Sequence, residues 1–368
     1  MSLPHKSHPL PPAKRRPTVR DIAKEVGLHF TTVAEALRDS PRVKAETRER
    51  VAAAAKKLGY RVDPMLSALS AYRSSKRQPV YQGTLAWINC FDDRHYFSNR
   101  TGFYGDCYRG ACLRSEDLGY RIEPFWMSEP GMTAGRASNI LESRNVAGVI
   151  VGPMPHGLDE LNLVWDKFCS VRIGYSIRNT NLTTIVTDHF SNMRMVYERL
   201  RSHGFRRIGF ACPADLDDRV NRHWSGSFFA MQSREEEANR VPAFLDPEMH
   251  GSPQAFTDWY HQNRPEVIIS GGARNYYNFL NEAGIAVPAE VQLVSIHTDG
   301  LAKGLSGISQ SGVTVGKVSI DHLVGSIHRY KAGIETHPKT VLVSGEWQDG
   351  ESYNGRAQPP LPAIPASA

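Results

Sequence analysis

The sequence predicts an all-α N-terminal unit followed by a larger α/β body of two doubly wound parallel-sheet lobes. Three short amphipathic segments between residues 18 and 59 predict the helical unit. From residue 81 onward, short apolar runs typical of buried strands alternate with helical patterns, and there are enough of them for two sheets. With 368 residues, 40% of them hydrophobic, the chain can bury two or three separate cores.

The helical unit lies within the first 60 residues. Thr18 and Asp21 have the spacing of a capping box, so we expect a helix to begin just after Thr18. Gly27 supplies a permissive backbone for a turn, a second helix follows, and a third spans about residues 45–58 and ends before Gly59. This pattern predicts a helix-turn-helix unit, with a plain helical bundle as the alternative. The inward apolar positions are Ile22, Ala23, Val26, Val33, Ala36, Leu37, Val51, Ala54 and Leu58.

Strand and helix patterns alternate through the body. We expect strands at residues 83–89, 121–127, 146–152, 171–175, 184–188, 207–210, 243–245, 267–270 and 291–296. We expect helices at residues 104–118, 134–143, 190–202, 225–239 and 253–263, and one that ends at residue 282. The cleft between two lobes of this kind is the default ligand site.

Charge is unevenly distributed along the chain. Residues 1–78 contain 17 Lys and Arg against 7 Asp and Glu, whereas the remainder contains 27 against 31. A basic unit on a mildly acidic body is typical of a nucleic-acid reader joined to a separate sensing module, although a solvated basic face would look the same. Residues 1–17 are rich in Pro, His and basic residues, and we expect a disordered arm there.

Several classes of site are not expected. The five cysteines are scattered without a C-x-x-C pair, so we predict neither a zinc site nor disulfides, and reduced thiols indicate a cytoplasmic protein. We find no phosphate-loop, nucleophile-elbow or H-E-x-x-H motif, no signal peptide and no membrane-spanning run, and so expect neither an enzyme nor a cofactor. The acidic segments 92–93 and 215–218 could bind a cation, but we interpret them as solvated loops.

The helical unit carries a longer motif. The sequence from Asp21 to Arg38, DIAKEVGLHFTTVAEALR, follows the pattern D-(I/V)-A-x-x-A-G-V-S-x-x-T-V-S-R-x-L-N, and T-R-x-x-V and L-G-Y follow at Thr47 and Leu58. Residues 18 to about 73 therefore resemble the DNA-binding headpiece and hinge of the LacI family of transcription regulators. The body more weakly resembles that family's periplasmic-binding-protein-like regulatory domain, through residues 186–188, 204–210 and 287–288.

The resemblance implies an organisation for the whole chain. It implies a helix-turn-helix domain at residues 18–61, a hinge helix and linker at 62–79, and a two-lobed effector-binding and dimerisation domain at 80–350. A tail follows at 351–368; it is Pro-rich and has no heptad pattern, so we expect no tetramer-forming segment there. Each lobe would be discontinuous, because the chain would cross between the lobes near residue 187, residues 308–312 and residues 340–345.

The resemblance also implies which side chains meet DNA. A recognition helix starting near Phe30 would enter the major groove, with Phe30, Thr31 and Glu35 at base edges, unless Phe30 is a core aromatic. Glu35 replaces an Arg and could accept a hydrogen bond from cytosine N4, and His29 replaces the capping Ser, so we expect a weaker cap. The phosphate-contact candidates are Thr32, Arg38, Arg42, Lys44 and Thr47, and the remaining DNA-binding candidates are Arg20 and Leu69.

The hinge begins with Asp63-Pro64, an N-cap followed by Pro at the first helical position. Residues 65–69 would form an apolar helix too short to be stable alone, so we expect it to fold only against its twofold mate on DNA. Leu69 lies nine residues after Tyr60, as does the family's leucine wedge, which kinks DNA from the minor groove. The alternative is that Leu66 and Leu69 pack on the body.

The effector site is less clearly marked. The family holds polar ligands, often sugars or nucleobases, with an Arg near the start of a second-lobe helix and an Asp on a strand-end loop. Arg222 lies about one residue out of register with that Arg, and the Asp is not evident in residues 268–274 or 295–299, which weakens the case for a sugar. Each aromatic candidate could equally be core or surface. The candidate cleft residues are Tyr96, Phe97, Phe103, Asp188, Arg222, Trp224 and His297.

Together these features predict a ligand-responsive transcription regulator. We expect a repressor that binds a pseudo-palindromic, double-stranded DNA operator as a homodimer, because one headpiece reads too short a site for useful specificity. We expect its effector to be a small polar metabolite in the cleft, with a sugar as one candidate, and expect no membrane partner. The alternative is a carbohydrate-binding or carbohydrate-processing protein with an appended DNA-binding unit.

Overall fold

The computed structural model describes residues 17–37, 43–60, 81–299, 304–329, 332–334 and 336–355. The chain divides into two compact units, residues 1–78 and residues 79–368, and each is described by itself. Within the described ranges no helix is long and apolar enough to cross a membrane.

The N-terminal unit consists of the three predicted helices, α1 (Val19–Val26), α2 (Phe30–Ala36) and α3 (Ala45–Leu58). The backbone N–H and the hydroxyl of Thr18 both donate to the Asp21 carboxylate at 2.7 Å, which confirms the capping box at the start of α1. Gly27, with φ at 68°, makes the turn between α1 and α2. The core is small and lies where the helices cross, and it is formed by Ile22, Ala23, Val33, Ala36, Val43, Val51, Ala54 and Ala55.

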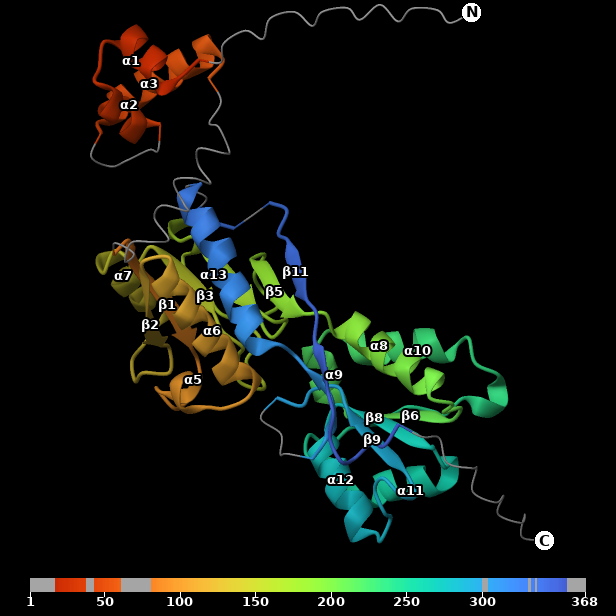
Figure 1. Cartoon of the computed structure of the whole chain (residues 1–368). Coiled ribbons are helices and arrows are strands. Elements are labelled where there is room, and N and C mark those ends of the chain that lie inside the picture. Colours follow the sequence, from red (N-terminus) through yellow and green to blue (C-terminus); the bar gives the residue numbers. More distant parts are fainter. Residues whose placement is uncertain are drawn as a thin grey trace, which may run out of the picture. The chain divides into compact units, whose positions relative to one another are not determined.

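The first lobe of the body is a six-stranded parallel sheet with helices on both faces (Figure 1). Leu85 and Trp87 pack with α6 (Phe103–Asp117) and α13 (Gly312–His328), whereas Ala86 and Ile88 pack with α7 (Ala134–Ser143), as alternation along a strand requires. A short helix, α5 (Tyr96–Asn99), precedes α6. The strand order is β11 (Thr340–Val343), β5 (Thr183–Thr187), β4 (Ser170–Ile173), β3 (Gly148–Val151), β1 (Gly83–Asn89) and β2 (Tyr120–Trp126).

The second lobe repeats this architecture. Its sheet is parallel except for β12, which runs antiparallel to β10. Helices α8 (His189–Ser202) and α10 (His223–Gln232) pack on one face, and α11 (Pro253–Asn263) and α12 (Ala273–Glu282) on the other. The strand order is β12 (Glu346–Gln348), β10 (Ser306–Ser309), β9 (Gln292–Ser295), β8 (Val267–Ser270), β6 (Ile208–Pro213) and β7 (Phe244–Asp246). The predicted fold of two doubly wound lobes is therefore confirmed.

The chain passes between the lobes at three places. β5 of the first sheet leads into α8 of the second lobe, β10 of the second sheet leads into α13 of the first, and β11 of the first sheet leads into β12 of the second. These crossings lie where they are predicted, near residues 187, 308–312 and 340–345. Each lobe is accordingly built from segments that are distant in sequence.

The sequence patterns do not predict helix α13, because much of it is Gly, Ser, Thr and Val, which are weak helix formers. Its small residues instead allow a close approach to α6 (Figure 1). A Cβ added at Gly110 would lie 2.1 Å from the carbonyl oxygen of Val313, and one at Gly316 would lie 2.0 Å from that of Cys107. The two helices therefore touch backbone to backbone, and this packing outweighs the low helix propensity.

The acidic segment 215–218 is not the solvated loop that we expect from its composition. It lies in a short helix, α9 (Ala214–Arg219), and Asp217 is only 2% exposed. The Asp217 carboxylate accepts a hydrogen bond from the backbone N–H of Ser225 at 3.1 Å, so it caps the first turn of α10. The helix expected at residues 225–239 ends at Gln232, and a 3-10 turn (Glu237–Asn239) follows.

Candidate functional site

Helix α2 presents a polar outer face in the N-terminal unit. Val33 and Ala36 turn into the core, whereas Thr31 and Glu35 are exposed on the opposite side. Phe30 is 44% exposed, so the alternative interpretation of Phe30 as a core aromatic is wrong. The Arg20 guanidinium lies 5.8 Å from the centroid of the Phe30 ring. An exposed helix face that combines an aromatic, a hydroxyl, a carboxylate and a neighbouring cation can contact both base edges and phosphates.

The His29 replacement has the predicted effect on the start of α2. No side chain caps this helix, and the His29 Nδ1 atom lies 2.8 Å from the Thr31 hydroxyl instead. Thr32 is half-buried, Lys44 is exposed just before α3, and Thr47 is half-buried in the first turn of α3. The other predicted DNA contacts, Arg38, Arg42 and Leu69, lie outside the described residues, as does the hinge.

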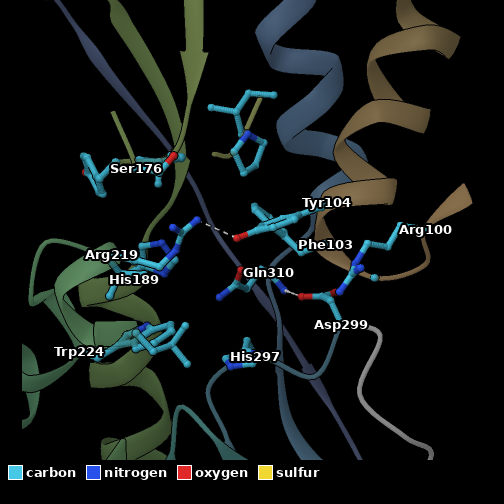
Figure 2. Close-up of a pocket in the computed structure, with 18 of the residues that line it drawn as sticks. Arg100, Phe103, Tyr104, Ser176, His189, Arg219, Trp224, His297, Asp299 and Gln310 are labelled. Carbon is cyan, nitrogen blue, oxygen red and sulfur yellow. Dashed lines mark hydrogen bonds between the residues drawn. The ribbon is translucent and has the colours of Figure 1, made fainter. Parts of the chain in front are cut away.

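A cavity of about 330 Å³ lies between the two lobes of the body (Figure 2). Its lining comes from loops that follow the carboxyl ends of strands in both sheets, where ligands of open parallel sheets bind. The first lobe contributes Arg100, Phe103, Tyr104, Pro153, Tyr175 and Ser176, among others. The second lobe and its crossing segments contribute His189, Leu216, Arg219, Val220, Trp224, His297, Asp299 and Gln310.

Arg219 joins the two walls of this cavity. It is the last residue of α9 in the second lobe, and its guanidinium donates to the Met154 carbonyl at 2.8 Å, the Pro155 carbonyl at 3.4 Å and the Tyr104 hydroxyl at 3.0 Å, all in the first lobe (Figure 2). All three acceptors are neutral oxygens. Because a guanidinium binds a carboxylate more strongly than a carbonyl, Arg219 retains capacity for an anionic partner.

One wall of the cavity is aromatic. The His297 ring stacks on Trp224 with centroids 5.8 Å apart, and the His189 ring meets Trp224 edge to face. Burial lowers the pKa of both imidazoles, that of His189 to about 3, so both are neutral at neutral pH. Within the described residues the His189 Nδ1 and Trp224 Nε1 atoms are buried without a hydrogen-bond partner.

Asp299 is the carboxylate that the described part of the chain contributes to the cavity lining. One of its oxygens accepts from the Ser309 hydroxyl and the other from the backbone N–H of Gln310, both at 2.6 Å. Arg100 stands at the cavity rim, where its guanidinium lies 4.6 Å from the centroid of the Tyr96 ring. Tyr96 in turn stacks on Phe91 at 3.5 Å.

The structure brings three of the seven predicted effector residues to the cavity, Phe103, Trp224 and His297. Tyr96 is not among the lining residues but contacts one of them, Arg100, and Phe97 is 4% exposed in the first-lobe core. Asp188 caps α8 by accepting from the Ser191 N–H at 3.0 Å. Arg222 is three-quarters exposed and pairs with Asp218 at 2.5 Å, and it is not among the residues that line the cavity.

The main residues that sequence reasoning missed are Arg219, Arg100, His189, Asp299 and Gln310. Four of them follow a strand directly or through a short helix: Arg219 follows β6, His189 follows β5, Asp299 follows β9 and Gln310 follows β10. The rule that ligand contacts lie at the carboxyl ends of parallel strands could have found them. Arg100 also follows a strand, β1, but at a greater distance in sequence, because a loop and the short helix α5 come between them. The described residues hold no cluster of three metal-ligating side chains.

Known proteins resemble both units of the chain. The family model for bacterial regulatory proteins of the lacI family matches residues 18–63, and the model for a periplasmic binding protein-like domain matches residues 197–353. The HTH-type transcriptional regulator GalR of Salmonella typhimurium is 22% identical over 292 residues, which cover 75% of this chain and 78% of GalR.

Two solved structures share the fold. The complex of the transcriptional regulator CelR with cellobiose superposes with a TM-score of 0.52 at 18% identity, covering 92% of this chain and 100% of CelR. The lac repressor dimer bound to operator and the anti-inducer ONPF gives a TM-score of 0.50 at 16% identity, covering 92% of this chain and 99% of that chain. With matches to both family models and to a regulator across most of its length, the chain belongs to the LacI family and is a DNA-binding transcription regulator.

Proposed function

We propose that this regulator is a repressor that binds a pseudo-palindromic operator as a homodimer and responds to a small polar metabolite bound between its lobes. The observation that carries the proposal is that residues of both lobes line the cavity. A ligand bound there contacts both lobes, and the angle between two such lobes can change. A ligand that prefers one angle shifts the equilibrium between two states of the protein. The coupling to DNA affinity would be about 1–3 kcal/mol.

In this proposal residues 18–61 read the DNA, residues 62–79 form the hinge and residues 80–350 bind the effector and dimerise. Phe30, Thr31 and Glu35 face base edges, and Leu69 enters the minor groove at the operator centre. The exposed outer face of α2 supports the base-reading assignment. We assign phosphate contacts to Arg20, Thr32, Arg38, Arg42, Lys44 and Thr47.

The relatives support a sugar-like effector as the starting hypothesis. CelR is named in a complex with cellobiose, and the lac repressor dimer in a complex with operator and an anti-inducer. The His297 ring, which stacks on the buried Trp224, lines the cavity and can contact the apolar face of a sugar ring. The relatives are transcription regulators, so a carbohydrate-processing enzyme is no longer a competing interpretation.

Selection of bound sequences from a random DNA pool by the full-length protein tests this proposal. We expect a twofold-symmetric motif with a fixed centre, and we expect Leu69→Ala to weaken specific binding far more than non-specific binding. Enrichment of an asymmetric motif would contradict the dimer. Equal losses of specific and non-specific affinity in Leu69→Ala would contradict the minor-groove assignment.

A further inference from the structure

The charges that line the cavity do not balance. Within the described residues the lining contains two guanidinium groups, those of Arg100 and Arg219, and a single carboxylate, that of Asp299. Both imidazoles of the lining are neutral, because burial lowers the pKa of His189 and of His297. The described lining of the cavity therefore has an excess of positive charge.

Of the three acidic residues in α9, Asp215 is exposed, and the two nearest to Arg219 in sequence are held elsewhere. The Asp217 carboxylate is buried and caps α10 through the Ser225 N–H, and the Asp218 carboxylate pairs with Arg222 at 2.5 Å. Arg219 is left with two carbonyl oxygens and the Tyr104 hydroxyl as its acceptors. A half-buried guanidinium that faces only neutral acceptors gains more from a ligand carboxylate than from a ligand hydroxyl.

The carboxylate of the described lining is already engaged by hydrogen bonds within the chain. Each Asp299 oxygen already accepts a short hydrogen bond from the chain, at 2.6 Å. The two guanidinium groups of the lining are donors only, whereas the Tyr104 and Ser176 hydroxyls and the Gln310 amide can both donate and accept. A sugar hydroxyl offers the guanidinium groups a neutral acceptor, whereas a carboxylate offers them a charged one and a stronger hydrogen bond.

The remaining lining limits the size and shape of the ligand. Phe103, Leu216, Val220 and Trp224 supply apolar surface for a carbon skeleton. A cavity of about 330 Å³ is at the small end for ligand sites, which typically measure roughly 300–1,000 Å³. This size fits a ligand with a single ring or a six-carbon chain.

We infer that the effector is a monocarboxylate of about monosaccharide size, such as a sugar acid, and that Arg219 binds its carboxylate with Arg100 as the second cation. This inference rests on the proposed function in taking the cavity as the effector site. The carboxylate replaces the carbonyl acceptors of Arg219 and neutralises the excess charge of the lining. Arg219 thereby becomes the residue that distinguishes acids from the neutral sugars of the same skeleton.

Calorimetric titration of the full-length protein with matched pairs tests the inference. The pairs are D-glucose with D-glucuronate, D-galactose with D-galacturonate, and D-glucose with D-gluconate, at constant ionic strength. We expect at least one acid to bind at least about tenfold more tightly than its neutral partner, the range of a charge-assisted hydrogen bond. Arg219→Gln should weaken binding of that acid by about 10- to 100-fold and leave the neutral sugar unaffected.

Two further variants distinguish the loss of the Arg219 contact from a general loss of structure. Arg222→Gln removes a neighbouring exposed arginine that does not line the cavity, and should leave all affinities unchanged. Arg219→Lys retains the charge but loses the planar fork, and should keep the preference for the acid at a reduced affinity. Thermal unfolding of each variant confirms that it is folded under the titration conditions.

Three results would overturn the inference: tighter or equal binding of the neutral sugars, no binding of any acid in the panel, or an equal loss in Arg219→Gln and Arg222→Gln. Its failure is separable from that of the proposed function. If a neutral sugar binds and changes operator affinity, the proposed function stands and only the inference of an acidic ligand is rejected. If an acid binds through Arg219 but leaves operator affinity unchanged, the inferred ligand class stands, and the proposal that this ligand is an effector is rejected.

Discussion

Replacing Gly110 by Ala tests the backbone contact between helices α6 and α13, which forms much of the first-lobe core. The added Cβ would lie 2.1 Å from the Val313 carbonyl oxygen, whereas ordinary contacts begin at 3.4 Å. The helices would have to separate by about 1 Å, and the packing contacts between them would weaken along their length. The carbonyl belongs to the backbone of α13 and cannot rotate away as a side chain would.

The magnitude follows from two opposing terms. Overpacking of this kind costs about 1–3 kcal/mol, and we take about 3 kcal/mol because the obstacle is backbone. Ala in place of Gly within a helix returns roughly 0.5–1 kcal/mol. The net loss of unfolding free energy is therefore about 2 kcal/mol, which lowers the urea midpoint by roughly 0.7 M for an m-value of about 3 kcal/mol/M.

Urea unfolding of the full-length protein, followed by far-UV circular dichroism, measures this loss. Gly226→Ala in helix α10 is the matched control, because a Cβ there meets no atom beyond its own helix within 4 Å of the described structure. We expect the control to be more stable than the wild type by about 0.5–1 kcal/mol. If Gly110→Ala shifts the midpoint in the same direction as Gly226→Ala, the helices do not pack in the way described.

Three further predictions concern single side chains. Asp21→Ala removes the acceptor for Thr18 and should destabilise α1 by about 1 kcal/mol, seen as faster hydrogen exchange of its amides; unchanged exchange would contradict the capping role. Glu35→Gln should change the preferred base at one position of each half-site in the DNA selection without altering the salt dependence of binding, and an unchanged motif would remove Glu35 from base reading. Because the pKa of His189 is lowered to about 3 in the folded protein, protons bind the unfolded chain preferentially below pH 6.5. Stability should therefore fall as the pH drops from 6.5 toward 3, by up to about 1.4 kcal/mol per pH unit for this group. His189→Phe should lose less stability than the wild type between pH 7 and pH 5, measured as urea midpoints; an equally steep loss would assign the pH dependence to other groups.

The fold could be predicted from the sequence wherever local pattern and tertiary packing agree. Strands β3 and β8 are short apolar runs, and helices α7 and α11 have amphipathic periods with clear ends, so their patterns suffice. Helix α13 could not be found in this way. Its small residues lower the helix propensity in isolation, and their value appears only when α6 is placed against them.

The candidate site was harder to predict, because a cavity depends on which loops meet. Trp224 and His297 could be selected by residue type, but Phe97, an equally good aromatic by composition, lies in the core. The choice between Arg219 and Arg222 depends on the direction of a helix. Arg219 ends α9 and faces the first lobe, whereas Arg222 begins the next turn with φ at 55° and faces Asp218. A spacing of three residues cannot distinguish these two outcomes before the turn is known.

Crossing segments contribute to the cavity lining, so under the proposed function a bound ligand would act on the angle between the lobes. Gln310 lines the cavity at one crossing, and its carbonyl accepts a hydrogen bond from the Thr187 hydroxyl at the next crossing, at 2.9 Å. At the third crossing the Gly345 N–H donates to Asn192 at 3.0 Å. Because these bonds tie the crossings to one another, a change of angle need not break them, whereas Arg219 reaches across to carbonyls of the opposite lobe and must exchange its partners when the lobes separate. Under the proposed function, a ligand group that competes for the Arg219 guanidinium would bind differently to the two arrangements of the lobes, and an effector requires such a differential contact.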